Sequence, residues 1–240
     1  MVSRYKAKRR TPITIEELGE LIAHVRQTSI GVRLDQTLKT SLIAVLYYSG
    51  LRVAEVVGDS KRKWKTLTQY GKQMANSSEG LGRDWMNTEE GFLWEWRYRG
   101  RLPGIIKEDI KKEGQLLYIE SPALKHGIRE DPLELSLTWP YVNIIREQWN
   151  DTPKEMRVWP ICQTSARTIV MEASEHLYPH AFRGSLASNM ARDPTISVSD
   201  MMGWFGWARA ATADNYIMAQ RSKVKARESI DRMVKKNDTN

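Results

Sequence analysis

An arginine at position 52 stands where a rigid, charged side chain could bind a phosphate group. Arg52 directly follows a strongly apolar run, residues 41–51. A guanidinium held in one orientation presents parallel donors, which can bind a phosphate through two hydrogen bonds. An ion pair with Glu55, three residues further on, is the structural alternative. For Arg52 considered alone, the ion pair is the favoured interpretation.

A second candidate phosphate site combines His180 and Arg183. Both follow Pro179, and proline is common in the first turn of a helix. Residues three apart share one helix face, so both side chains should project near a helix N-terminus, whose free N–H groups attract anions. A His-x-x-Arg pair is also common by chance, and a packed or surface histidine usually explains it.

Three further residues carry reactive or hydrogen-bonding groups. Lys125 lies in a predicted turn between strands over residues 115–120 and 132–137, where a lysine is usually solvated. A lone tyrosine near a C-terminus, such as Tyr216, is usually a half-buried packing residue. Trp207 can donate a hydrogen bond through its indole N–H but cannot accept one. None of the three indicates a function by itself.

In chain order, these residues fall in motifs that resemble the catalytic domain of the tyrosine recombinase, or phage integrase, family. The motifs are Ser49-Gly50-Leu51-Arg52-Val53-Ala54-Glu55, His180-Ala181-Phe182-Arg183, and Gly206-Trp207 with Tyr216 nine residues after Trp207. Lys125 stands where the family has its β-hairpin lysine. Most members have histidine where Trp207 stands, and several have tryptophan. The resemblance covers roughly residues 12–58 and 104–236.

The resemblance implies a catalytic set of Arg52, Lys125, His180, Arg183, Trp207 and Tyr216. Tyr216 would attack a DNA phosphodiester to form a 3′-phosphotyrosyl link, which the 5′-hydroxyl of another strand later reverses. Arg52 and Arg183 would offset the negative charge that develops on the phosphate oxygens. His180 would bind the phosphate or accept the phenolic proton, and Lys125 would protonate the leaving 5′-oxygen.

Hydrophobic periodicity predicts a mainly α-helical chain with one small antiparallel β-sheet, an α+β fold. Thr14 and Glu17 form a capping box that opens the first helix. A central helix is expected over about residues 35–48, and the hairpin around Lys125 supplies the sheet. Further helices are expected at about 139–149, 164–175, 180–191, 196–203 and 218–235. By resemblance, this is the fold of a tyrosine recombinase or type IB topoisomerase-like catalytic domain.

The predicted domain organisation is a basic tail over residues 1–10 and a catalytic domain over residues 11–216, followed by a C-terminal helix and tail over residues 217–240. The last segment is expected to dock on a neighbouring protomer, with packing in cis as the alternative. Residues 59–103, which hold four of the nine tryptophans, interrupt the catalytic domain as an insertion. The insertion either contacts DNA or another protomer, or forms a small core of its own. The family's usual N-terminal DNA-clamping domain has no counterpart in the short basic tail.

The charge of the chain favours a polyanionic partner. The formal net charge is +8, and the positive excess lies in residues 1–10, 59–103 and 217–240. These segments could follow a phosphate backbone, while solvated mobile segments are the alternative. The longest apolar run is far shorter than the roughly 20 residues of a membrane-spanning helix, and no signal peptide is recognisable.

Residue usage gives no support for a metal or nucleotide cofactor, and we expect neither. The single cysteine, Cys162, excludes an internal disulfide and any cysteine-rich zinc module, which fits a reducing compartment. The four histidines show no paired ligand spacing, and no carboxylate cluster of the two-metal type is present. The chain contains neither a P-loop nor a Gly-x-Gly-x-x-Gly motif.

The resemblance, together with these observations, implies a site-specific DNA recombinase, the integrase of a viral or plasmid mobile element. It would need neither metal nor ATP, would bind double-stranded DNA, and would self-associate on it, as a tetramer. Its expected location is the cytoplasm or nucleoid of a prokaryotic host. One alternative is a type IB topoisomerase-like nicking and closing enzyme. The other is a catalytically inactive DNA-binding protein on the same fold.

Overall fold

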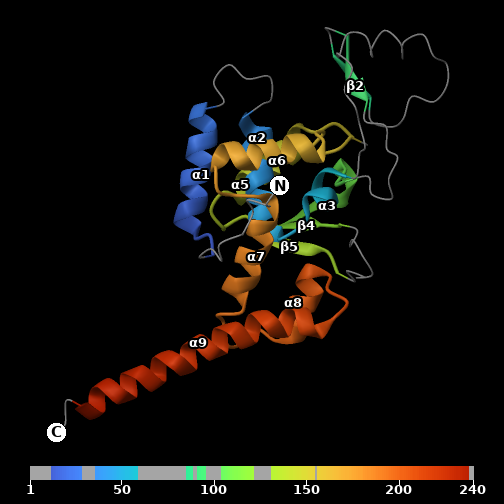
Figure 1. Ribbon diagram of the computed structural model, residues 1–240. Coiled ribbons are helices and arrows are strands. Elements are labelled where there is room, and N and C mark those ends of the chain that lie inside the picture. Colours follow the sequence, from blue (N-terminus) through green and yellow to red (C-terminus); the bar gives the residue numbers. More distant parts are fainter. Residues whose placement is uncertain are drawn as a thin grey trace, which may run out of the picture.

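The computed structural model describes residues 12–28, 36–58, 85–88, 91–95, 104–121, 131–154 and 156–237 (Figure 1). For residues 85–88, 91–95, 223 and 232–237 it describes the backbone only. This part of the chain is mostly helical and contains a small three-stranded antiparallel sheet. The predicted fold class, mainly α with a small antiparallel sheet, is therefore confirmed.

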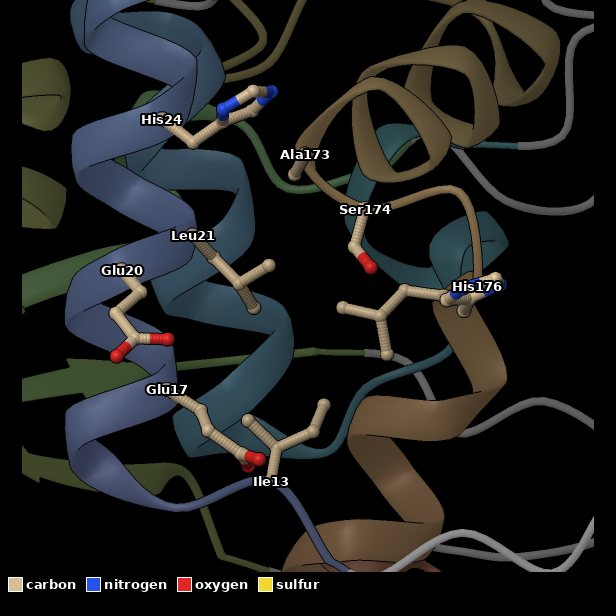
Figure 2. A pocket seen from close by; sticks show the side chains of 9 residues that line it. Ile13, Glu17, Glu20, Leu21, His24, Ala173, Ser174 and His176 are labelled. Atoms are coloured by element: carbon tan, nitrogen blue, oxygen red, sulfur yellow. The ribbon is translucent and has the colours of Figure 1, made fainter.

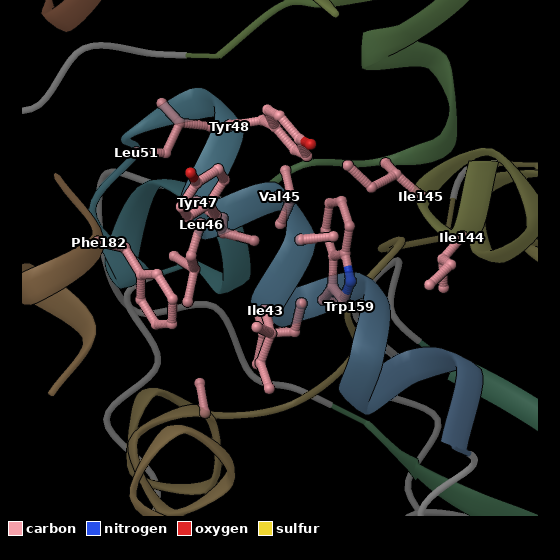
Figure 3. Close-up of a cluster of buried hydrophobic side chains, with 14 of the residues drawn as sticks. Ile43, Val45, Leu46, Tyr47, Tyr48, Leu51, Ile144, Ile145, Trp159 and Phe182 are labelled. Carbon is pink, nitrogen blue, oxygen red and sulfur yellow. The ribbon is translucent and has the colours of Figure 1, made fainter. Parts of the chain in front are cut away.

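The centre of the fold is the helix α2, Gln36–Ser49, which is buried from Leu38 to its C-terminal end. Its residues are apolar on nearly all sides, so it can only be stable when other elements surround it. It packs against α1 (Ile15–Thr28), α5 (Val142–Asp151), α6 (Gln163–Ala173) and α7 (Pro179–Met190). Figure 3 shows the cluster of buried side chains that gathers around it.

The first helix, α1, begins at the predicted capping box. The Glu17 backbone N–H donates to Thr14 Oγ1 at 3.2 Å, and the Thr14 N–H donates to Glu17 Oε2 at 2.8 Å. These two bonds satisfy donors that a helix N-terminus otherwise leaves open. Leu18, Ile22 and Val25 recur at helical spacing and are buried against the core, as expected.

The sheet has the strand order β3-β4-β5. Its three strands lie between α2 and α5 along the chain. The predicted hairpin strands correspond to β4 (Leu116–Ile119) and β5 (Leu133–Ser136), which pair antiparallel. A third strand, β3 (Ile110–Glu113), pairs with β4 and was not predicted from the sequence. Only Ile110 of that strand is buried, and the next three residues are charged, so β3 has no apolar alternation to reveal it.

The connection between α2 and the sheet contains short elements as well. The short helix α3 (Val53–Val57) follows Arg52, and the 3₁₀ turn η1 (Lys107–Asp109) precedes β3. In the predicted insertion, the backbone of β1 (Trp85–Thr88) pairs antiparallel with that of β2 (Gly91–Glu95). The rest of the insertion lies outside the described residues, so its proposed roles stay predictions.

The C-terminal part consists of α7, α8 (Val198–Phe205) and α9 (Ala210–Asn237). The predicted start of the last helix, after Tyr216, is wrong, because α9 begins six residues before Tyr216. Residues 208–215 show no apolar period, but Ala213 and Ile217 are buried against α7 and α8 and hold this part of the helix in place. The predicted boundary between residues 216 and 217 therefore falls inside one continuous helix, whose far end leaves the body (Figure 1).

Trp159 joins the central helix to the segment before α6. Its side chain is fully buried, and its indole Nε1–H donates to Ser41 Oγ of α2 at 2.9 Å. Replacing Trp159 by alanine should lower the free energy of unfolding by about 3–5 kcal/mol, since it leaves a cavity and removes the hydrogen bond that the Ser41 hydroxyl accepts. The measurement is urea unfolding followed by far-ultraviolet circular dichroism. Trp139→Ala is the matched control and should lower the free energy of unfolding much less, because Trp139 is 39% exposed. Equal losses would contradict the role of Trp159 as a link between α2 and the segment before α6.

Candidate active site

The first candidate residue, Arg52, is fixed by the turn between α2 and α3. The chain leaves α2 through Gly50, whose φ of 60° is the left-handed conformation that glycine adopts without strain. Arg52 then takes the N-cap position of α3. Its backbone N–H donates to Glu55 Oε2 at 2.6 Å, and its Nη1 donates to Glu55 Oε1 at 2.9 Å. The predicted ion pair is thus present, and 30% of the Arg52 side chain stays exposed.

Arg183 lies deeper than Arg52 and connects three segments. Its side chain is 3% exposed, and Nη1 donates to the carbonyl oxygen of Gly50 at 2.7 Å. Its Nη2 donates to the carbonyl oxygen of Phe205 at 2.7 Å, and Nη1 is 4.0 Å from Glu55 Oε2. A guanidinium offers five donors in a fixed plane, which lets one side chain join the end of α2 to the end of α8.

The buried carboxylate of Glu55 therefore lies between the two arginines. Glu55 is 1% exposed, so its charge would be very costly without these partners. Two guanidinium groups against one carboxylate leave the trio with a net charge of +1. The site keeps an excess positive charge next to the partly exposed Arg52, as a phosphate-binding site requires.

His180 lies in the first turn of α7, and its side chain is exposed. Its pKa is lowered from the ordinary value, first by partial desolvation of the ring and then by the charges of Arg183 and Arg52. A lowered pKa keeps the imidazole neutral at neutral pH. His180 can therefore accept a proton there, as a general base must.

Trp207 and Tyr216 lie in a stack of aromatic rings. The Trp207 ring stacks on Phe205 at 4.5 Å between centroids and on Tyr216 at 5.6 Å, with interplanar angles of 19° and 10°. The Arg183 guanidinium carbon lies 5.0 Å from the Phe205 ring centroid and 5.5 Å from that of Trp207. Both distances fall within the range of cation–π contacts.

The phenol of Tyr216 is half-buried beside α7. A Cβ atom placed on Gly184 would lie 3.9 Å from the Tyr216 hydroxyl oxygen, so this oxygen is close to the turn that carries Arg183. Desolvation raises the pKa of Tyr216, the positive charge of Arg183 opposes that rise, and Tyr178 adds to it. The phenol is thus protonated at neutral pH and needs a base to become a nucleophile.

Five of the six predicted site residues are therefore placed by the structure. Contacts connect four of them, and His180 is close enough to Arg183 and Arg52 for their charges to lower its pKa. Arg52 and Arg183 share Glu55, Arg183 contacts Trp207, and Trp207 stacks on Tyr216. Lys125 lies outside the described residues, so its predicted role stays untested. Phe205 was not among the residues predicted from the sequence. In the sequence it resembles an ordinary core residue, and its position directly before Gly206-Trp207 is the one feature that distinguishes it.

A separate cavity of about 550 Å³ lies between α1 and the segment that joins α6 to α7 (Figure 2). Carboxylates of α1, Glu17 and Glu20, share it with the imidazoles of His24 and His176. It contains none of the predicted site residues. Across the described part of the chain, no three His, Cys, Asp or Glu side chains are grouped closely enough to hold a metal ion. Nor is any helix of that part long and apolar enough to cross a membrane.

Comparison with known proteins supports the fold assignment. XerA recombinase, a tyrosine recombinase of known crystal structure, superposes with a TM-score of 0.51 at 11% sequence identity. The match covers 95% of this chain and 66% of the XerA chain. The chain therefore has the fold of a tyrosine recombinase-like catalytic domain. No family model and no curated protein matches the sequence.

Replacing Glu55 by glutamine tests the link between the two arginines. Glutamine keeps the size of the side chain but removes the charge that both guanidinium groups face. The free energy of unfolding should fall by about 3 kcal/mol, the cost of leaving buried charge uncompensated. The measurement is chemical denaturation at low salt. Glu134→Gln, at an exposed position of β5, should change stability by less than about 0.5 kcal/mol. Equal effects of the two substitutions would contradict the role of Glu55.

Proposed function

We propose that this chain cleaves and rejoins DNA strands as a site-specific recombinase, with Tyr216 as the nucleophile. The observation that carries the proposal is the cluster of Arg52, Arg183, Trp207 and Tyr216, with His180 at its edge. These residues come from four separate segments and are joined by the Glu55 ion pairs and the aromatic stack. The likeness to XerA recombinase in fold supports the same class of reaction.

In the proposed reaction, the phenol oxygen of Tyr216 bonds to a DNA phosphorus, and the bond from that phosphorus to the 5′-oxygen breaks. His180 accepts the phenolic proton, which its lowered pKa allows at neutral pH. Lys125 supplies a proton to the leaving 5′-oxygen. The attack adds negative charge to the non-bridging oxygens, and Arg52 and Arg183 offset this charge.

The second half of the reaction is the reverse of the first. The 5′-hydroxyl of another strand attacks the phosphotyrosyl phosphorus, and the Tyr216 oxygen leaves and takes back a proton. Each step exchanges one phosphodiester-type bond for another, so no ATP is consumed. The fixed guanidinium charges stabilise the phosphate, so the proposed mechanism uses no metal ion. Exchange between two duplexes would give integration or excision of a mobile element in a prokaryotic host.

The test is covalent capture on a nicked suicide duplex that the protein binds, in buffer containing EDTA. Wild-type protein should give a protein–DNA band that survives denaturing electrophoresis, and Tyr216→Phe should give none. Tyr118→Phe, on β4, is the matched control and should keep the band. The rate of band formation should rise with pH as His180 loses its proton, and His180→Asn should lower it by about 10²-fold or more.

Two results of this experiment would contradict the proposal. A band of equal intensity with Tyr216→Phe would exclude Tyr216 as the nucleophile. Absence of a band from wild-type protein on DNA that it binds would favour the inactive DNA-binding alternative. Relaxation of supercoiled DNA without any joining between duplexes would instead indicate a nicking and closing enzyme.

We further propose that several copies assemble on DNA through α9, as a tetramer. Beyond Ile217 the helix leaves the body, and its apolar residues Met218, Val224 and Ile230 are 54–59% exposed. Exposed apolar side chains on a projecting helix favour docking on another surface. The basic residues of the same helix complicate a simple truncation, because removing them would weaken DNA binding as well.

The assembly proposal is tested by replacing Val224 and Ile230 together with serine, which keeps every charge of α9. The variant should bind one DNA site with unchanged affinity and salt dependence but should lose the slower-migrating complexes on paired sites. Native gels and sedimentation velocity measure both quantities. Serine at the exposed Met171 of α6 is the control and should preserve assembly. Unchanged assembly by the double variant would contradict docking through this part of α9.

A further inference from the structure

We infer that Phe205 is a positioning residue, which holds Trp207 and Arg183 in the orientation that the reaction needs. The inference rests on the function proposed above, but its structural part depends only on the contacts of one residue. Phe205 is the last residue of α8 and is 1% exposed. It touches all three segments that resemble the recombinase motifs, and neither the sequence motifs nor the proposed chemistry include it.

The contacts of Phe205 are made by both its backbone and its ring. The carbonyl oxygen accepts a hydrogen bond from Arg183 Nη2 at 2.7 Å. The ring lies 5.0 Å from the Arg183 guanidinium carbon and stacks on Trp207 at 4.5 Å. A Cβ atom placed on Gly50 would lie 2.5 Å from the ring, so the ring also fills the space beside the turn after α2.

The turn after Phe205 brings Trp207 back over the ring. Gly206 adopts the left-handed conformation with φ 61°, and the Trp207 backbone N–H donates to the Met202 carbonyl at 3.0 Å. The chain therefore turns back after α8, and the Trp207 indole lies against the end of that helix. A flat neighbour can stack on it nearly in parallel, whereas a branched aliphatic side chain of similar size cannot.

The stack extends from Phe205 to the proposed nucleophile. Trp207 is stacked on Phe205 and on Tyr216, and both interplanar angles are below 20°. Phe205 thus restricts the tilt of the indole, and the indole restricts the tilt of the phenol. The same ring lies beside the Arg183 guanidinium, so one residue orients a phosphate-binding group and the nucleophile together.

This arrangement predicts a distinct effect of Phe205→Leu. Leucine keeps the site apolar and the backbone carbonyl in place, but it removes the flat ring. DNA affinity should stay unchanged, while the rate of covalent complex formation at saturating DNA should fall about 10- to 100-fold, because misplaced reacting groups lose rate rather than binding. Phe182→Leu is the matched control, since Phe182 is fully buried in α7 and is not part of the stack.

A second measurement reports the stack without any catalysis. Protein labelled with 5-fluorotryptophan gives ¹⁹F signals from its nine tryptophans, and Trp207→Phe identifies the Trp207 signal. Phe205→Leu should shift and broaden that signal, whereas Phe182→Leu should leave it in place. Thermal melts confirm that both variants are folded. The nicked duplex used above is the substrate for the rate measurement.

The inference would be overturned by an unmoved Trp207 signal in Phe205→Leu, by an equal shift in the two variants, or by equal slowing of cleavage by both. A shifted signal with normal cleavage would also overturn it, because the stack would then not position the reacting groups. If wild-type protein forms no covalent complex at all, the proposed function fails. The fluorine signal then still decides whether Phe205 holds Trp207.

Discussion

The buried carboxylate of Glu55 is the constraint on which the site depends. It lies between Arg52 and Arg183, and without it two guanidinium groups would face each other beside the core. The free energy of burying these charges is offset only if the carboxylate and the donors keep good geometry. The C-terminal ends of α2 and α8, the short helix α3 and the part of α7 that carries Arg183 must therefore meet at fixed positions. The rest of the fold can be understood as the scaffold that holds these ends together.

That scaffold is centred on α2, which is apolar on nearly every side. Because other elements surround α2, the turn after Ser49 has little freedom to move. Gly50 in its left-handed conformation presents its carbonyl to Arg183 and leaves room for the Phe205 ring. Buried apolar surface thus supplies the stability, and polar contacts at one end of the helix supply the orientation. This separation of roles explains how a charged cluster can exist beside a large hydrophobic core.

The sequence predicts those features that depend on local patterns. The capping box of Thr14 and Glu17 and the apolar period of α1 needed no tertiary information, and the same holds for the alternation in β5. Features that depend on distant contacts were missed or misplaced. β3 pairs through its backbone while its side chains are mostly charged, and the start of α9 is held by packing of Ala213 against other helices.

In the candidate site, too, local patterns could be predicted from the sequence and long-range contacts could not. The positions of Arg52 and Arg183 follow from motif spacing, but the burial of Arg183 and its bonds to two carbonyl groups do not, because these partners lie 133 and 22 residues away. The part played by Phe205 depends on three long-range contacts at once. No local pattern could have separated it from the other buried residues of the chain.

The electrostatics of the site also follow from the two arginines. Burial lowers the pKa of His180 and the charges of both arginines lower it further, while the charge of Arg183 opposes the rise that burial causes in the pKa of Tyr216. The lowered pKa keeps the imidazole neutral and able to accept a proton at neutral pH, although it makes the imidazole a weaker base, and the charge of Arg183 limits how far burial weakens the phenol as an acid. The same charges would attract a phosphate. In the proposed reaction, phosphate binding and the proton affinities of the nucleophile and the base would therefore all depend on one pair of guanidinium groups, which Glu55 holds in place.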